Sequence, residues 1–164
     1  MSPKAMENRK ILFVCTGNTC RSVLAQYYAS RLAADAFPQS AKAPLALEFF
    51  SAGLVVAKDI LQPAIVSELL KKEGIKHFSH KPEQISAEIA ESAGLILSMT
   101  KEHKEAVIRL FPEAAAKTMT LMEYAGFGAE DLPDPYGRDN LFYLEVFTLI
   151  KSAIKAAFEK LKKM

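Results

Sequence analysis

Short apolar runs alternate with stretches of helical periodicity along this chain. The run "KILFVC" is continuous and of strand length, which is typical of a strand covered on both faces. Three further runs have a similar length, and the last of them is the weakest. The pattern predicts strands at residues 10–15, 45–53, 94–99 and 117–122.

Helical stripes occupy the intervals between these runs. In the last stripe, apolar side chains recur every three or four residues. Ser22 and Thr100 are expected N-cap residues. Pro63 is expected at the first position of a helix that ends before Gly74. Five helices are predicted: one that starts at Ser22, one over 62–74, a short one that ends at residue 92, one from Thr100 to about Phe111, and one over 143–161.

Strands that alternate with helices predict an α/β fold. We expect a single domain over residues 1–164, with three layers: a four-stranded parallel sheet flanked by helices on both faces. Residues 1–8 are expected to form a flexible tail, and the segment 123–140, with its glycines and prolines, a functional loop. Ligands of such sheets bind beyond the carboxyl ends of the strands, where Cys15 and Ser51 lie.

Composition and charge limit the possible partners. The 164 residues are 50% hydrophobic and 24% charged, with a net charge of +2. That charge is too small to indicate nucleic acid or an anionic membrane as partner, and no apolar run approaches the ~18 residues that span a bilayer. No secretion signal is recognisable, and two cysteines form no disulfide framework, so the cytoplasm is the expected location. The oligomeric state stays open.

The loop after the first strand has the composition of an anion-binding nest. Gly17 and Asn18 tolerate positive φ angles, which let successive backbone N–H groups point inward near a helix N-terminus. Arg21 adds two parallel donors that suit a phosphate-like oxyanion. The same surroundings stabilise a thiolate at Cys15, to which Ser22 is expected to donate a hydrogen bond. The sequence therefore predicts a nucleophile at the bottom of an oxyanion-binding cup.

Other readings of the same residues are weaker. A cysteine at the end of a strand is usually inert packing, but here the loop supplies every partner of a reactive thiolate. A metal site is disfavoured because both cysteines lie in one loop and His77, His80 and His103 show no ligand spacing; we assign the histidines no role. A nucleoside-triphosphate loop would need a final Gly-Lys-Ser/Thr element, which is missing.

The stretch "CTGNTCRS" at residues 15–22 resembles the phosphate-binding signature of the low-molecular-weight protein tyrosine phosphatases. That signature is a cysteine, five residues, then arginine and serine, with a second cysteine just before the arginine. The segments "SAG" (51–53), "SHKP" (79–82), "LSMTKEH" (97–103) and "DLPDPYG" (131–137) fall where the family has similar segments. By this resemblance, the phosphate-binding loop contains Thr16, Gly17, Asn18, Thr19, Cys20 and Ser22.

The resemblance implies a two-step displacement on a phosphorylated protein substrate, without metal or organic cofactor. Cys15 would attack phosphorus and form a phospho-cysteine while Arg21 and the loop amides hold the equatorial oxygens. Asp134 would protonate the leaving group and then activate water, with Asp131 as the rival for this task.

Further residues receive supporting roles from the resemblance. Asn18 and Ser51 would brace the loop by hydrogen bonds, although each could be an ordinary turn residue. Tyr136 would form a wall of the substrate slot unless it is simply an exposed loop residue. Cys20 could form a reversible disulfide with Cys15 or remain a plain structural thiol.

Two positions depart from the usual family pattern. Val23 stands where proline is common, which loosens the start of the helix without removing a catalytic group. Thr19 stands where tyrosine-specific members usually carry isoleucine, and threonine there resembles the bacterial protein arginine phosphatase branch. Phosphotyrosine remains the default substrate and phosphoarginine the alternative.

Two other function classes are considered. A thioredoxin-coupled arsenate reductase would need resolving cysteines, and residues 77–94, where they would lie, contain none. A non-catalytic phosphoprotein-binding module would be expected to lack a catalytic group, whereas Cys15, Arg21 and Asp134 are all present.

Overall fold

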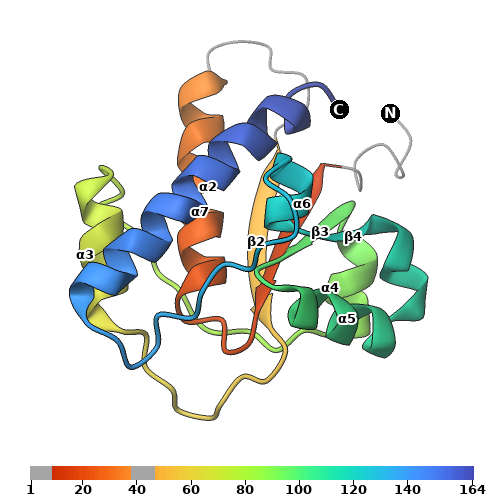
Figure 1. Cartoon of the computed structure of the whole chain (residues 1–164), viewed down its shortest axis with the longest axis horizontal. Helices are drawn as coiled ribbons and strands as arrows, with labels where there is room; N and C mark the ends of the chain where they lie inside the picture. Colours follow the sequence, from red (N-terminus) through yellow and green to blue (C-terminus); the bar gives the residue numbers. More distant parts are fainter. Residues whose placement is uncertain (1–8, 38–46) are drawn as a thin grey trace.

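Four parallel strands form the centre of the molecule. The computed structural model describes residues 9–37 and 47–164, and the expected tail at residues 1–8 lies outside these ranges. The strands are hydrogen-bonded in the order β2-β1-β3-β4 (Figure 1). Their bounds are β1 (Lys10–Cys15), β2 (Glu48–Gly53), β3 (Leu95–Ser98) and β4 (Thr118–Thr120).

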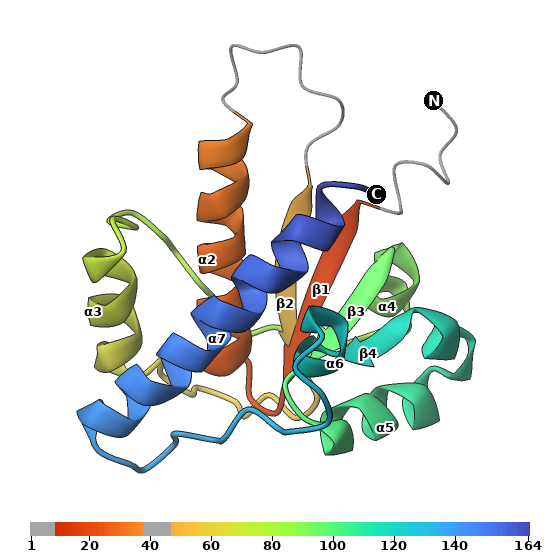
Figure 2. The same ribbon diagram turned by 45° about the horizontal axis from the view of Figure 1, so that its top comes forward.

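Helices cover both faces of this sheet, which confirms the predicted α/β fold with a four-stranded parallel sheet (Figures 1 and 2). Helices α2, α3, α6 and α7 contribute to the core on one face, and α4 and α5 to the core on the other. The helical segments are α2 (Arg21–Ala36), α3 (Ala64–Lys72), α4 (Ala87–Ser92), α5 (Lys101–Leu110), the 3-10 helix η1 (Pro112–Lys117), α6 (Leu121–Ala125) and α7 (Asn140–Leu161).

Strand β1 is buried on both faces, as its unbroken apolar run predicts. Ile11 and Phe13 pack in the core that holds α2 and α7, whereas Leu12 and Val14 pack in the opposite core. This alternation is the two-residue period of a strand between two helical layers. Cys15 follows at the end of the strand and pairs in register with Gly53 of β2.

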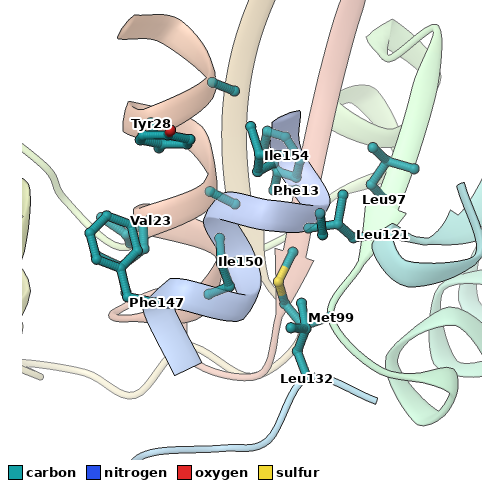
Figure 3. Packing of buried hydrophobic residues seen from close by; sticks show 14 of the residues in the cluster. Phe13, Val23, Tyr28, Leu97, Met99, Leu121, Leu132, Phe147, Ile150 and Ile154 are labelled. Atoms are coloured by element: carbon teal, nitrogen blue, oxygen red, sulfur yellow. The ribbon is translucent and has the colours of Figure 1, made fainter. Parts of the chain in front are cut away.

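The long helix α7 lies across the sheet and packs against α2 (Figures 2 and 3). Figure 3 shows Phe147 of α7 beside Val23 of α2, and Ile154 of α7 beside Phe13 of β1. The predicted apolar stripe of this helix is confirmed, since every member is buried: Tyr143, Phe147, Ile150, Ile154, Phe158 and Leu161.

Several predicted boundaries are confirmed. The side chain of Thr100 caps α5 by accepting a hydrogen bond from the His103 N–H, and α5 ends just before Phe111. Helix α4 ends at Ser92, as expected. Gly74 lies just past α3 with a φ of +80°. The strand predicted at 45–53 starts at Glu48 in the structure, and its first two residues lie outside the described ranges.

Three local predictions are wrong. Ser22 is not an N-cap, because α2 already begins at Arg21 and the Ser22 hydroxyl is bonded elsewhere. Pro63 precedes α3 at the N-cap position instead of opening the helix. The loop expected at 123–140 begins as helix α6, whose capping box is formed by Thr120 and Glu123. Among the described residues, no helix has the length and apolarity needed to cross a membrane.

Candidate active site

A cavity of about 220 Å³ opens at the carboxyl end of β1. Three segments far apart in the chain line it, and Figure 2 shows the connections that follow β1 and β2 and precede α7 gathering at this end of the sheet. The lining residues are Cys15, Thr16, Gly17, Thr19, Cys20, Arg21, Val55, Ile60, Asp134 and Tyr136.

The backbone after β1 curls so that its carbonyl groups face the protein. The carbonyls of Cys15 and Thr16 accept hydrogen bonds from residues 54 and 55, and the carbonyl of Asn18 lies 2.9 Å from His80 Nε2. Within the described ranges, the N–H groups of residues 16–20 donate to no other part of the chain. This backbone therefore offers a set of amide donors to an anion in the cavity.

The curl depends on one left-handed residue and one close approach. Asn18 has a φ of 54°, as expected for such a nest, whereas Gly17 has no positive φ. A Cβ atom on Gly53 would lie 2.7 Å from the carbonyl oxygen of Thr16, which real side chains do not tolerate. Gly53 of β2 is therefore needed for the loop to pass next to the neighbouring strand.

Asn18 is the centre of a buried hydrogen-bond network. Its Nδ2 atom lies 2.9 Å from the hydroxyl oxygens of both Ser22 and Ser51, and its Oδ1 accepts from the Glu83 N–H at 3.0 Å. Ser51 in turn donates to Gln26 Oε1 at 2.6 Å. The structure brings together Asn18 and Ser51 in the bracing arrangement that the sequence analysis expects.

Cys15 lies at the floor of the cavity and is only 4% exposed. Its Sγ atom is 2.9 Å from Ser22 Oγ, which is the contact predicted for these two residues. A hydroxyl that donates to this sulfur stabilises the thiolate form, which is the nucleophilic form of cysteine.

Arg21 connects the phosphate-binding loop with the late loop that precedes α7. Its side chain is 5% exposed; Nη1 donates to the Leu132 carbonyl at 3.0 Å, and Nη2 lies 3.5 Å from Asp134 Oδ2. Asp134 itself is 59% exposed, and its Oδ1 accepts from the Tyr136 N–H. A carboxyl group thus lines the same cavity as the phosphate-binding loop.

Asp131 is engaged elsewhere. Its Oδ1 accepts a hydrogen bond of 2.8 Å from the N–H of Lys101, the first residue of α5. A carboxylate in this position satisfies a free amide and complements the helix dipole. The geometry favours Asp134 over Asp131 as the acid of the cavity.

The second loop cysteine has a different environment from the first. Burial, followed by the nearby Cys15, raises the pKa of the Cys20 thiol well above its ordinary value. Both cysteines are free thiols in this structure. Cys20 therefore stays protonated at neutral pH.

Thr19 and Tyr136 both line the cavity, but they differ in exposure. Thr19 is largely buried within the loop, whereas the Tyr136 side chain is 72% exposed at the rim. Val55 and Ile60, from the segment after β2, add apolar surface to the same rim. The cavity mouth therefore combines aliphatic and aromatic walls.

Two histidines contact the phosphate-binding loop, although the sequence analysis gives them no role. His80 packs against Tyr27 and bonds the Asn18 carbonyl, and burial lowers its pKa. His103 Nε2 is 2.8 Å from Thr16 Oγ1. Both lie in segments that carry the family resemblance, "SHKP" and "LSMTKEH", and this is the signal that could have identified them.

The structure offers no alternative centre for metal chemistry in the part of the chain that it describes. No group of three or more His, Cys, Asp or Glu side chains is placed there to hold a metal ion. The polar side chains that line the cavity carry one guanidinium, one carboxyl, the two thiols of the loop and three hydroxyl groups.

Comparison with known proteins gives a consistent result. Residues 10–164 match the family described as low molecular weight phosphotyrosine protein phosphatase. The chain is 32% identical to the protein-arginine-phosphatase of Geobacillus stearothermophilus over 93% of each chain. It is 30% identical to the low molecular weight protein-tyrosine-phosphatase Ptp of Acinetobacter johnsonii, over 91% of this chain and 95% of that one.

A solved structure supports the same relationship. The YwlE arginine phosphatase, in a mutant with a phosphorylated active-site serine, superimposes with a TM-score of 0.82 at 28% identity, covering 94% of this chain and 96% of that one. The chain belongs to the low-molecular-weight protein tyrosine phosphatase family, whose members are cysteine-dependent phosphatases.

Proposed function

We propose that this chain hydrolyses phosphorylated side chains of proteins through a phospho-cysteine at Cys15, with phosphotyrosine as its substrate. The observation that carries this proposal is the position of the Cys15 sulfur. It lies at the floor of a cavity lined by the loop after β1, Arg21 and Asp134, and the loop amides donate to no other described residue.

In the first step, the Cys15 thiolate attacks phosphorus, and a sulfur–phosphorus bond forms as the bond to the leaving oxygen breaks. The amides of the loop and the Arg21 guanidinium stabilise the charge on the equatorial oxygens. Asp134 gives its proton to the leaving oxygen. The phosphorylated active-site serine of the YwlE mutant is the analogous covalent state of that relative.

In the second step, the Asp134 carboxylate takes a proton from water, whose oxygen attacks phosphorus. The sulfur–phosphorus bond breaks, and inorganic phosphate leaves together with the regenerated thiolate. Ser22 stabilises this thiolate as a leaving group through its 2.9 Å contact. The exposed position of Asp134 suits this role, since water must reach it.

The walls of the cavity mouth support phosphotyrosine. Val55, Ile60 and Tyr136 provide aliphatic and aromatic surface, against which a phenyl ring packs well. Phosphoarginine is the second candidate, and Thr19 is the observation that favours it: a hydroxyl lines the cavity where an apolar wall is usual. The Geobacillus relative, named a protein-arginine-phosphatase, is consistent with this candidate.

The proposal is tested with p-nitrophenyl phosphate and with matched phosphotyrosine and phosphoarginine peptides. We expect turnover by the wild-type chain, loss of at least about 10⁴-fold in Cys15→Ser, and phosphate trapped on the wild-type cysteine by rapid acid quench. Absence of turnover by the folded wild-type chain would contradict the function. If the wild-type chain prefers the phosphoarginine peptide and Thr19→Ile prefers the phosphotyrosine peptide, phosphoarginine is the substrate instead of phosphotyrosine.

A further inference from the structure

A buried imidazole lies directly behind the wall of the cavity. His103, in the first turn of α5, is 7% exposed, and its Nε2 atom is 2.8 Å from the hydroxyl oxygen of Thr16. Thr16 itself is exposed and lines the cavity next to Cys15. His103 therefore contacts the cavity through one hydroxyl group and takes no part in the displacement described above.

The imidazole is neutral at physiological pH. Burial, followed by the charge of Arg21, lowers the pKa of His103 to about 4, although Asp134 and Asp131 act in the opposite direction. The position at the N-terminus of α5 also disfavours a cation. One ring nitrogen therefore carries a proton, and the other has a free lone pair.

The surroundings of the ring select which nitrogen is protonated. Among the residues that the structure describes, the buried Nδ1 atom has no hydrogen-bond partner. A proton on Nδ1 would create a buried N–H group with no acceptor, which is rare in proteins, whereas an unpaired acceptor is tolerated more often. The favoured tautomer carries its proton on Nε2 and donates to Thr16 Oγ1.

We propose that His103 is a positioning residue whose Nε2–H group fixes the Thr16 hydroxyl, so that the Thr16 proton stays available to an oxygen atom of the bound phosphorylated side chain. This inference rests on the proposed function. With the opposite tautomer, the Thr16 hydroxyl would donate its only proton to Nε2 of His103. It could then accept a hydrogen bond from the substrate but could not donate one. The tautomer of His103 thus determines whether the Thr16 hydroxyl, next to Cys15, can donate a hydrogen bond to the substrate or can only accept one.

The tautomer is measured first, in the absence of any substrate. Long-range ¹H–¹⁵N correlation spectra of the ¹⁵N-histidine-labelled chain distinguish a protonated from a bare ring nitrogen, and His103→Gln assigns the resonance. We expect Nε2 protonated and Nδ1 bare at neutral pH. Protonation at Nδ1 would overturn the proposal. Turnover by the same sample tests the proposed function separately, so the two can fail independently.

The kinetic test compares Thr16→Val, His103→Leu and the double variant on p-nitrophenyl phosphate. Each single change is expected to lower kcat/KM about five- to tenfold, the effect of one neutral hydrogen bond, and the double variant is expected to lose no more than either alone. His103→Gln is expected to stay within about threefold of wild type, because its carboxamide N–H replaces the Nε2–H group.

Additive losses in the double variant would overturn the proposal, because they would mean that His103 acts through packing and not through Thr16. Unchanged kinetics of Thr16→Val would overturn it as well. If His103→Leu does not fold, the cycle is run with His103→Gln and Thr16→Val. The proposal then predicts that the double variant has the same kcat/KM as Thr16→Val alone, because the glutamine N–H has no hydroxyl group to bond. His77→Gln, an exposed histidine outside the cavity, is the matched control and is expected to behave as wild type.

Discussion

The two loops that form the cavity differ in how firmly the fold holds them. In the loop after β1, Asn18 and Ser22 are fully buried and Arg21 nearly so, and hydrogen bonds connect the loop to β2, α2 and the segment before α4. In the late loop before α7, Asp134 and Tyr136 are both largely exposed. The late loop is attached by the backbone of the buried Leu132, which bonds Arg21 and Met99, and by Asp131, which bonds the Lys101 N–H.

This difference matches the two tasks of a phosphatase. Donors that stabilise a developing phosphoryl charge act best when they are fixed before the reaction and shielded from water. A general acid that later becomes a base must meet the leaving group and then water. We therefore expect changes in the first loop to affect both catalysis and stability, and changes in the late loop to affect catalysis alone.

Among the changes that test this contrast between the loops, the largest effect is expected at Arg21, where the two loops meet. Arg21→Lys removes the planar pair of donors and the bond to the Leu132 carbonyl, so kcat/KM is expected to fall about 10³-fold. Steady-state kinetics on an aryl phosphate measure this loss. Arg31→Lys, an exposed arginine on the outer part of α2, is the matched control and should retain full activity. A loss below tenfold in Arg21→Lys would mean that the amides alone hold the phosphoryl group.

The next effect is expected in the late loop. Asp134→Asn is predicted to lower kcat about 10²- to 10³-fold, most strongly for aryl phosphates with poor leaving groups, with little change in the free energy of unfolding. Asp131→Asn tests the rival acid: because Asp131 bonds the first amide of α5, it should change kcat by less than about threefold. Reversal of these two results would assign the acid to Asp131.

The hydrogen-bond network around Asn18 is expected to support both the activity and the stability of the chain. Asn18→Ala leaves two buried hydroxyl groups and the Glu83 amide without their partner, so the free energy of unfolding should fall by about 2–4 kcal/mol. The value of kcat/KM should fall about tenfold or more as the loop loosens. Urea denaturation and kinetics on the same samples measure both. Reduced activity of Asn18→Ala at an unchanged free energy of unfolding would contradict the expectation that changes in the first loop affect both properties.

The smallest effect concerns pH. Because the pKa of His103 is lowered to about 4 in the folded chain, the unfolded state binds the proton first as the pH falls from 6.5. The chain should therefore lose stability between about pH 6.5 and 4, by on the order of 3 kcal/mol from this group. His103→Gln should flatten the curve of unfolding free energy against pH in this window. Parallel curves for the two chains would contradict a lowered pKa.

Much of this site could be predicted from local sequence. The thiol of Cys15, the curled loop and the guanidinium of Arg21 could be predicted from one short segment, because all of them lie within seven residues after an apolar run. The bracing roles of Asn18 and Ser51 were expected from the family resemblance, and the structure joins the two side chains directly because β1 and β2 end at the same edge of the parallel sheet.

Predictions failed where particular side-chain contacts override the general preference of a residue type or a periodic pattern. Ser22 has the side chain of an N-cap, yet the Cys15 sulfur and the Asn18 amide occupy its hydroxyl. Helix α6 was missed because it has only five residues, and its capping box and the packing of Leu121 stabilise it more than any periodic pattern indicates.

By itself, the sequence determined the helical layers around a parallel sheet and the sequence neighbourhood of Cys15, the loop and Arg21, since periodicity and motif spacing depend on neighbours along the chain. Only the tertiary structure decided which carboxyl group faces the cavity, and only it placed His80 and His103 behind the loop. His103 and Thr16 lie 87 positions apart, and no local pattern encodes such a pair. Their contact exists because β1 and β3 run side by side and release their connections at the same end of the sheet.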